Sequence, residues 1–213
     1  MLARPTVLIA DDHPLFREAL KLALSQADSD AKPVEAATLS DAMIAAAETP
    51  ELALILLDLR MSDSQGFAGL AQLHAERPDT PILVVTGVEQ LDAPQRARQF
   101  GAVGFVRKSE PLEAISAAIA SALRGDAAFT AEQDDPELQD IAEKIASLTP
   151  TQLKVLLGVL HGKLNKQIAF ELNIAEATVK AHMTAILRKL NVLNRTQAAL
   201  AARALELEAE PSI

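Results

Sequence analysis

The sequence predicts two domains, an α/β domain with a five-stranded, parallel, doubly wound sheet and a smaller all-α domain. Strand-like and helix-like segments alternate over residues 1–125, as in a parallel sheet with helices on both faces. From residue 147 the pattern is purely helical, and an acidic stretch over residues 126–146 lies between the two parts. The length of 213 residues suits one or two domains, and a hydrophobic fraction of 49% is sufficient for packed cores.

Five short segments rich in leucine and β-branched residues are expected to be the strands of the first domain. Several are continuously apolar, as in parallel strands that are buried on both faces. They are Val7–Ala10, Val34–Ala37, Leu52–Leu57, Ile82–Val85 and Gly104–Val106. Helical patterns alternate with them over Leu15–Ser25, Asp41–Ala47, Ala68–Ala75, Ala93–Phe100 and Leu112–Leu123, and Ser40 is the expected cap of the second helix. Such a sheet places its site beyond the carboxyl ends of the strands.

The second part of the chain, residues 147–213, is expected to contain four helices. Residues 126–146 are acidic and include a proline, so we expect a linker with a helical turn at its end. Thr149 and Pro150 are expected to cap and open a helix that runs to about His161. The other helices are expected over about Lys166–Leu172, Glu176–Leu190 and Thr196–Glu208, with an acidic tail at the C-terminus.

Composition excludes several classes of protein. The chain has no cysteine, which rules out disulfides, thiolate metal sites and a cysteine nucleophile. The four histidines are scattered and form no zinc-binding pattern; His13 is expected in a loop and His74 on a solvent-facing helix surface. No segment has the length of a membrane span or the features of a secretion signal, so we expect no membrane contact and a cytoplasmic location.

The net charge of −9 is unevenly distributed. Residues 1–125 carry 11 basic and 17 acidic residues, residues 126–146 carry 1 and 7, and residues 147–205 carry 8 and 2. The helical part up to residue 205 therefore has a net charge of +6, and the last eight residues add three glutamates. A basic segment in an acidic protein is typical of a local site for nucleic acid. On charge alone, a solvated lysine-rich surface is the alternative.

Polar side chains stand at the carboxyl ends of four predicted strands. Asp11 and Asp12 follow the first strand, Asp58 follows the third, Thr86 the fourth and Lys108 the fifth. A single aspartate after a strand is most often a helix cap, but five such residues at one edge of a parallel sheet predict a site. Three crowded carboxylates need a cation, and Mg²⁺ prefers oxygen ligands and keeps coordination places for a phosphoryl group. One carboxylate can then attack phosphorus as a nucleophile.

Residues 1–125 resemble the receiver domain of two-component signalling. The matching stretches are Val7-Leu8-Ile9-Ala10-Asp11-Asp12-His13-Pro14, Leu56-Leu57-Asp58-Leu59-Arg60-Met61, Val84-Val85-Thr86-Gly87 and Gly104-Phe105-Val106-Arg107-Lys108. The resemblance implies a flavodoxin-like sheet with Asp58 as the phosphoacceptor. It also implies that Asp11, Asp12 and Asp58 serve Mg²⁺, with Asp12 and the backbone carbonyl of Arg60 as direct ligands.

The same resemblance assigns residues that stabilise the phosphoryl group and switch the domain. Lys108 is expected to pair with the phosphoryl oxygens, Thr86 to move toward them, and Phe105 to swing inward behind Thr86. This would turn a local change of charge into a change of the domain surface. The family usually has proline where this chain has Ser62, and we expect this difference to loosen the loop after the phosphoacceptor.

The segment from residue 148 to residue 200 resembles the LuxR-type helix-turn-helix domain of the NarL/FixJ group of response regulators. The matching stretches are Asn165-Lys166-Gln167-Ile168-Ala169, Ala177-Thr178-Val179-Lys180-Ala181-His182 and Asn191-Val192-Leu193-Asn194-Arg195-Thr196-Gln197-Ala198-Ala199. Helical periodicity puts four apolar residues of the expected recognition helix on one buried face, namely Val179, Met183, Ile186 and Leu190. The opposite face has small residues and a few long donors, which suits entry into a major groove.

The resemblance also implies roles for single residues of this domain. Lys180, Ala181 and Thr184 are expected at base edges. Contacts to phosphate are expected from Lys166, Thr178 and Arg188. The last helix resembles the one that dimerises this domain, with Ala198, Ala201, Ala202 and Leu205 as the residues concerned. In the alternative interpretation, these apolar residues only close the four-helix core.

We therefore expect a response regulator that acts as a transcription factor and not as an enzyme, although its receiver could catalyse its own phosphorylation and dephosphorylation. A sensor histidine kinase or a small phosphodonor would phosphorylate Asp58, which would control homodimerisation and binding to double-stranded promoter DNA. An aspartate-nucleophile phosphatase is an alternative, but it needs a second acid where this chain has Arg60. A regulator that only binds, with no phosphorylation, is the other alternative.

Overall fold

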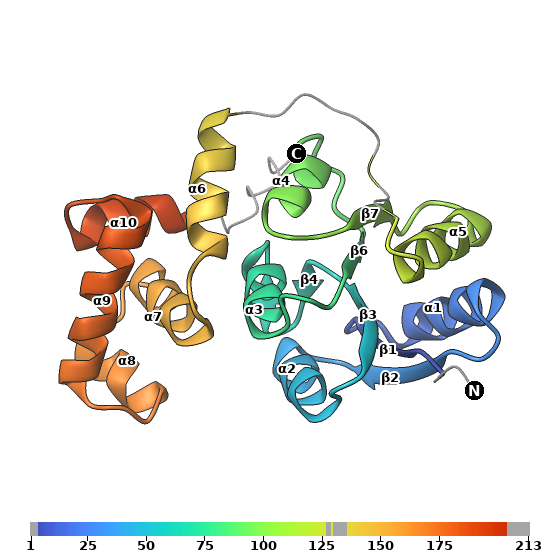
Figure 1. The fold of residues 1–213 in the computed structure, drawn as a ribbon, viewed down its shortest axis with the longest axis horizontal. Coiled ribbons are helices and arrows are strands. Elements are labelled where there is room, and N and C mark those ends of the chain that lie inside the picture. Colours follow the sequence, from blue (N-terminus) through green and yellow to red (C-terminus); the bar gives the residue numbers. More distant parts are fainter. Residues whose placement is uncertain (1–3, 127–128, 130–135, 204–213) are drawn as a thin grey trace.

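The computed structural model describes residues 4–126, 129 and 136–203, which form an α/β domain and a helical domain (Figure 1). The main sheet has the order β2-β1-β3-β6-β7, and all its pairings are parallel. Its strands are β1 (Thr6–Ala10), β2 (Lys32–Ala36), β3 (Leu52–Leu57), β6 (Ile82–Thr86) and β7 (Gly104–Arg107). The helices of this domain are α1 (Pro14–Ala27), α2 (Leu39–Glu48), α3 (Ala68–Glu76), α4 (Ala93–Gln99) and α5 (Leu112–Leu123). The predicted doubly wound sheet is confirmed.

Two apolar cores lie on opposite faces of the sheet, because successive side chains of a strand point to opposite faces. Val7 and Ile9 of β1 pack in one core with α1 and α5. Leu8 and Ala10 pack in the other core, which also contains apolar residues of α2, α3 and α4. This double burial explains why the strands are continuously apolar in the sequence.

A short hairpin follows the third strand of the main sheet. It consists of β4 (Arg60–Met61) and β5 (Ser64–Gln65), paired antiparallel. Asp63, in the turn of this hairpin, accepts hydrogen bonds from the backbone N–H groups of Leu39 and Ser40 at 2.7 and 3.0 Å. The cap of α2 is therefore Thr38, supported by Asp63, and the prediction that Ser40 caps this helix is wrong.

The helical domain contains α7 (Pro150–Leu160), α8 (Asn165–Glu171), α9 (Glu176–Leu190) and α10 (Arg195–Ala202). The Thr149 side chain accepts a hydrogen bond from the Gln152 N–H, and the Gln152 side chain accepts one from the Thr149 N–H. This reciprocal cap explains why α7 begins where the sequence predicts. Asn191 ends α9 with a φ of 55°. The described part of the last helix ends at Ala202, so its predicted extension to Glu208 is outside the described residues.

Two further expectations from the sequence differ from the structure. The stretch expected to be a linker with one helical turn contains an 11-residue helix, α6 (Pro136–Ala146). Ile145 of this helix is buried, and such packing stabilises an 11-residue helix that would be marginal on its own. His74 is partly buried against Gly101 instead of facing solvent, and a Cβ on Gly101 would lie 2.7 Å from its ring.

The two domains are in contact through helices on one side of the sheet. Helix α6 packs on α3 and α4, and α7 packs on α3. The apolar core that lies under α2, α3 and α4 continues into the helical domain, and it includes Ile145 and Leu148. Beside this contact lies a hollow of about 500 Å³ between the β4–β5 hairpin and Leu157 of α7. No helix among the described residues is long and apolar enough to cross a membrane.

Candidate functional site

The register of the sheet brings the predicted polar residues together. The Asp58 N–H donates to the Ala10 carbonyl at 2.9 Å, so the carboxyl ends of β1 and β3 are level. The Lys108 N–H donates to the Thr86 carbonyl at 2.8 Å, which aligns the ends of β6 and β7 in the same way. In this strand order, β1 and β3 are the pair at which the connections diverge to opposite sides of the sheet, and this crevice holds the site.

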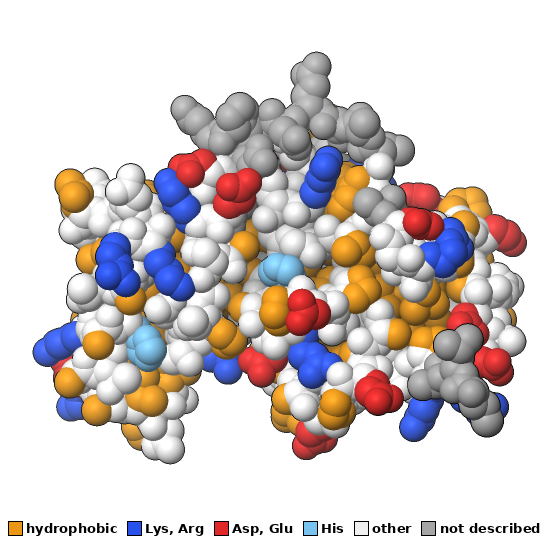
Figure 2. All heavy atoms as spheres, in the orientation of Figure 1, with side chains coloured by type: hydrophobic (Ala, Val, Ile, Leu, Met, Phe, Trp, Pro, Cys, Tyr) orange, Lys and Arg blue, Asp and Glu red, His pale blue; other side chains and the backbone are white. Residues whose placement is uncertain are grey.

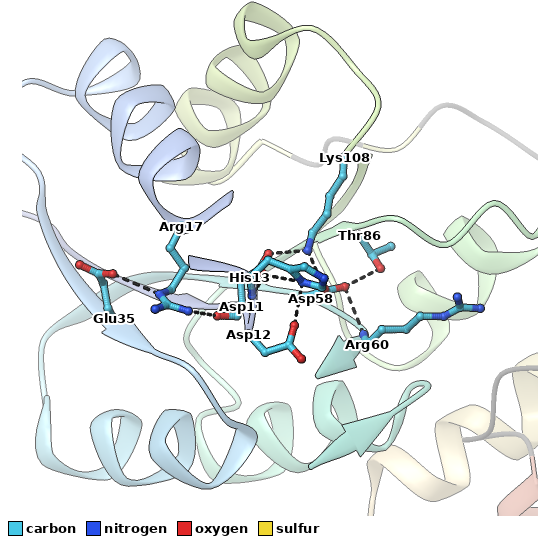
Figure 3. Close-up of polar contacts among 9 residues, drawn as sticks. All are labelled: Asp11, Asp12, His13, Arg17, Glu35, Asp58, Arg60, Thr86 and Lys108. Atoms are coloured by element: carbon cyan, nitrogen blue, oxygen red, sulfur yellow. Dashed lines mark hydrogen bonds and ion pairs between the residues drawn. The ribbon is translucent and has the colours of Figure 1, made fainter. Parts of the chain in front are cut away.

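Asp58 lies at the centre of the cluster, and 5% of the whole residue is exposed (Figure 3). Its Oδ1 accepts hydrogen bonds from the Thr86 hydroxyl at 2.7 Å and from the Arg60 N–H at 3.1 Å. Its Oδ2 lies 2.6 Å from Lys108 Nζ, which is also 2.6 Å from Asp11 Oδ2. Both oxygens of Asp58 are thus held in defined positions.

The charged side chains of the site have an excess of negative charge that a cation can neutralise. Lys108 supplies one positive charge to three neighbouring carboxylates, those of Asp11, Asp12 and Asp58. One ligand atom from each of these carboxylates and one from His13 lie within 4.8 Å of one another. Because hard divalent cations prefer such oxygen ligands, these residues fit a metal ion. The role of the Arg60 carbonyl as a metal ligand stays a prediction.

Three residues of α1 and the preceding loop belong to the site, although the sequence did not assign them to it. His13 Nδ1 lies 2.7 Å from Asp12 Oδ1 and 3.3 Å from Asp11 Oδ1. Arg17 donates to the Asp11 carbonyl at 2.7 Å, one helical turn after His13. Phe16 lies with its ring 4.7 Å from Lys108 Nζ, within reach of a cation–π contact. In the sequence, only the position of these residues shortly after Asp11 and Asp12 could have indicated that they belong to the site.

A hollow of about 620 Å³ opens onto Asp58. Its wall includes His13, Arg60, Gly87 and Lys108, together with the apolar residues Leu15, Phe16 and Ala19. Leu15 is 85% exposed at its rim. The buried carboxylate can therefore be reached from solvent on the side where α1 begins. Phe105 is half-buried in β7 and paired in register with Val84, and its inward swing stays a prediction.

The predicted recognition helix α9 has the expected two faces. Val179, Met183, Ile186 and Leu190 are buried in the helical domain. All six side chains predicted to contact DNA are exposed: Lys166, Thr178, Lys180, Ala181, Thr184 and Arg188. Figure 2 shows Lys and Arg side chains over both domains, with more acidic side chains over the α/β domain. The packing of the helical domain on the α/β domain thus leaves the outer face of α9 exposed.

Burial in α10 argues against part of the predicted dimer surface. Ala198 and Ala202 are fully buried, because they close the core of the helical domain against α7 and α9. A buried methyl group cannot contact a second chain without unpacking its own domain. Ala201 is half-buried, and Leu205 lies outside the described residues. Leu200 is the exposed apolar residue of this helix, at 57%.

Comparisons with known proteins cover both domains. Residues 7–120 match the response regulator receiver domain, and residues 146–202 match the bacterial regulatory proteins of the luxR family. A glycerol metabolism activator of Pseudomonas putida is 40% identical over 214 residues, covering 95% of this chain and 97% of that protein. The response regulator protein VraR of Staphylococcus aureus is 31% identical over 197 residues, covering 91% and 94%.

Solved structures agree with the fold. A complex of the two-component response regulator RcsB with DNA aligns with a TM-score of 0.55 and 22% identity, covering 95% of this chain and all of that chain. The two family matches coincide with the two domains of the structure. The acidic cluster lies in the first domain and the exposed α9 lies in the second. The chain therefore belongs to the response regulators, as a transcription regulator that joins a receiver domain to a LuxR-type DNA-binding domain.

Proposed function

We propose that phosphorylation of Asp58 by a sensor histidine kinase or a small phosphodonor controls dimerisation and promoter binding by this protein. The observation that carries the proposal is the bonding of Asp58. Thr86 contacts one of its carboxylate oxygens and Lys108 the other, so each oxygen has a hydroxyl or ammonium partner. The Thr86 hydroxyl and the Lys108 ammonium can therefore stabilise the negative charge that develops on a phosphoryl group during its transfer.

In the proposed reaction, a carboxylate oxygen of Asp58 attacks phosphorus and an acyl phosphate bond forms. The bond from phosphorus to the donor breaks, and the histidine or carboxylate leaving group keeps its electron pair. Lys108 is placed to pair with phosphoryl oxygens. Asp11, Asp12 and the backbone carbonyl of Arg60 would hold Mg²⁺ beside Asp58, and the ion would neutralise charge on the phosphoryl oxygens.

The path from Asp58 to the DNA-binding domain is short. Thr86 ends β6, which leads to α4, and the hairpin after Asp58 leads to α3. These two helices are the ones that contact α6 and α7. Movement of Thr86 toward a phosphoryl group, with Phe105 turning inward behind it, would thus change a surface on which the helical domain packs.

On DNA, α9 would lie in the major groove, with Lys180, Ala181 and Thr184 at base edges. Lys166, Thr178 and Arg188 would contact phosphates, and their exposure supports this arrangement. A homodimer formed through the exposed side of the last helix, where Leu200 lies, would match a paired half-site. The proposed place of action is the cytoplasm, where bacterial promoter DNA lies.

The test is to incubate the protein with acetyl phosphate and Mg²⁺ and to measure both labelling and DNA affinity. We expect one labelled residue, Asp58, and tighter binding to promoter fragments after labelling. Asp58→Asn keeps the shape of the side chain but removes the nucleophile, and we expect it to stay unlabelled. Labelling of this variant would refute the assignment of the acceptor, whereas labelling without a change in DNA affinity would refute the switch.

The same experiment separates the alternatives. A phosphatase of the aspartate-nucleophile class would release phosphate from generic monoesters with turnover, and Arg60 occupies the place of the acid it needs. A regulator that only binds would show neither labelling nor a response to Mg²⁺. Lys108 lies within bonding distance of Asp11 and Asp58, and this arrangement favours phosphorylation over the two alternatives.

A further inference from the structure

His13 is fixed beside the acidic cluster by its backbone. The next residue, Pro14, disfavours helical backbone at His13, which has φ −88° and ψ 107°. The His13 N–H donates to Asp11 Oδ1 at 2.8 Å, and its carbonyl accepts hydrogen bonds from the Phe16 and Arg17 N–H groups at 3.1 Å. The position of its Cβ is therefore determined by the start of α1.

The imidazole of His13 points to the carboxylates, although 68% of the side chain is exposed (Figure 3). Its Nδ1 lies 2.7 Å from Asp12 Oδ1 and 3.3 Å from Asp11 Oδ1. Two neighbouring ligands of one octahedral cation, each at about 2.1 Å from it, are about 3 Å apart. The separation of His13 and Asp12 is thus close to that of two ligands of one metal ion, and it also suits an ion pair.

We propose that His13 is a ligand of the divalent cation, so that the site has mixed nitrogen and oxygen donors. The inference rests on the metal dependence proposed above. Mg²⁺ gains little from an imidazole, whereas first-row transition ions gain more. The preference of the site for Mn²⁺ over Mg²⁺ is therefore higher with His13 than with carboxylates alone. With Nδ1 on the metal, the outer nitrogen of the ring can bond to water, as the exposure of His13 allows.

Binding of Mn²⁺ is the direct test, and it needs no phosphorylation. The chain has no tryptophan or tyrosine, so electron paramagnetic resonance and calorimetry are better suited than intrinsic fluorescence. We expect the Mn²⁺ complex to show coupling to an imidazole nitrogen in spin-echo spectra. His13→Ala should abolish this coupling. It should also weaken Mn²⁺ binding by at least about 10–100-fold, because even residues that only orient metal ligands have effects of this size. The loss of Mg²⁺ affinity should be smaller.

Two further variants separate ligation from simple hydrogen bonding. His13→Asn keeps a polar side chain at this position but offers no imidazole, and we expect it to behave as His13→Ala. His161→Asn, an exposed histidine of the helical domain, should keep both the coupling and the affinity.

The outcomes that overturn the inference are distinct from those that overturn the proposed function. Mn²⁺ bound by the unaltered protein without nitrogen coupling would refute ligation by His13 and leave the proposed function standing. Metal binding by His13→Ala that is as tight as in the unaltered protein, or tighter, would likewise refute ligation by His13 and leave the proposed function standing. Absence of any Mn²⁺ or Mg²⁺ binding would refute both the ligation and the metal part of the proposed function.

Discussion

The ammonium of Lys108 lies 2.6 Å from Oδ2 of Asp58 and joins the end of β7 to the end of β3, with β6 between them. The side chains of Lys108 and Asp58 are 16% and 2% exposed, so water screens their interaction only in part. Lys108 also contacts Asp11, which is fully buried. This one cation thus reduces the repulsion between two buried carboxylates.

Replacement of Lys108 by Met should destabilise the protein when no metal is bound. We expect a loss of about 2–3 kcal/mol, somewhat below the cost of removing one partner of a fully buried pair. Urea denaturation in EDTA measures it. Addition of Asp58→Asn to this variant should recover part of the loss, because one of the crowded charges is then absent. A double variant that is no more stable than Lys108→Met would show that repulsion is not the cause.

Thr86 is expected to matter for the response and not for labelling. Its hydroxyl donates to Asp58 Oδ1 at 2.7 Å but is not the nucleophile. Thr86→Ala should therefore still be labelled by acetyl phosphate, while the labelled protein gains less DNA affinity than the unaltered one. Thr86→Ser keeps the hydroxyl and is the matched control. Complete loss of labelling in Thr86→Ala, with the fold intact, would contradict this division of roles.

Asp63 should stabilise α2 from a distance. Burial opposes ionisation of Asp63, but hydrogen bonds from Ser40 and Leu39 outweigh it and lower the pKa below its ordinary value of 3.8. We expect Asp63→Ala to cost about 1–2 kcal/mol in the free energy of unfolding, as for a lost helix cap. The contribution is present above pH 3.8 and is lost as the pH falls below that value through the folded pKa. A variant with an unchanged midpoint in urea at pH 7 would rule out the cap.

His74 should make stability depend on pH in the mildly acidic range. Burial lowers the pKa of His74 below its ordinary value of 6.5, so the unfolded chain binds the proton more readily than the folded protein. Stability from this residue is complete above pH 6.5 and is lost as the pH falls through that value to the folded pKa. Urea denaturation at pH 7.5 and 5.5 should show a smaller difference for His74→Gln than for the unaltered protein or for His161→Gln. Equal differences in all three would remove His74 as the cause.

Lys180 should contribute to DNA binding, and its neighbour Glu176 should weaken it. Lys180 Nζ lies 3.2 Å from a Glu176 carboxylate oxygen on the exposed side of α9. Lys180→Ala should cost about 1–3 kcal/mol of specific binding if the residue contacts a base, or lower the salt dependence if it contacts phosphate. Glu176→Gln removes a negative charge from the same surface and should tighten binding. Unchanged affinity in Lys180→Ala would contradict both placements.

The strand ends of the receiver domain could be located from the sequence because parallel strands have few possible arrangements. Once the strands were predicted, the connection rules brought Asp11, Asp58 and Lys108 to one edge. The two faces of α9 could be predicted in the same way, because helical periodicity alone separates Val179 from Lys180. These features depend on contacts that are local in sequence or repeated along a strand.

Features that depend on side chains distant in sequence could not be predicted. The loosening of the loop by Ser62 stays a prediction, but the hydrogen bonds that tie the neighbouring Asp63 to α2, 24 residues earlier in the chain, could not be predicted. The helix α6 forms where composition indicated a linker, because its apolar residue Ile145 packs in the shared core. His74 faces Gly101 in a loop 27 residues later.

The sequence by itself determined the two domains, the carboxylates at the strand ends and the apolar face of α9, because each follows from a repeating pattern or a strand boundary. Only the tertiary structure decided which groups bond to Asp58, that His13 joins the acidic cluster, and that α6 and α7 pack on α3 and α4. The physical reason is distance along the chain. Periodicity fixes the direction of a side chain on its own element, whereas its partner is fixed only when the elements pack together.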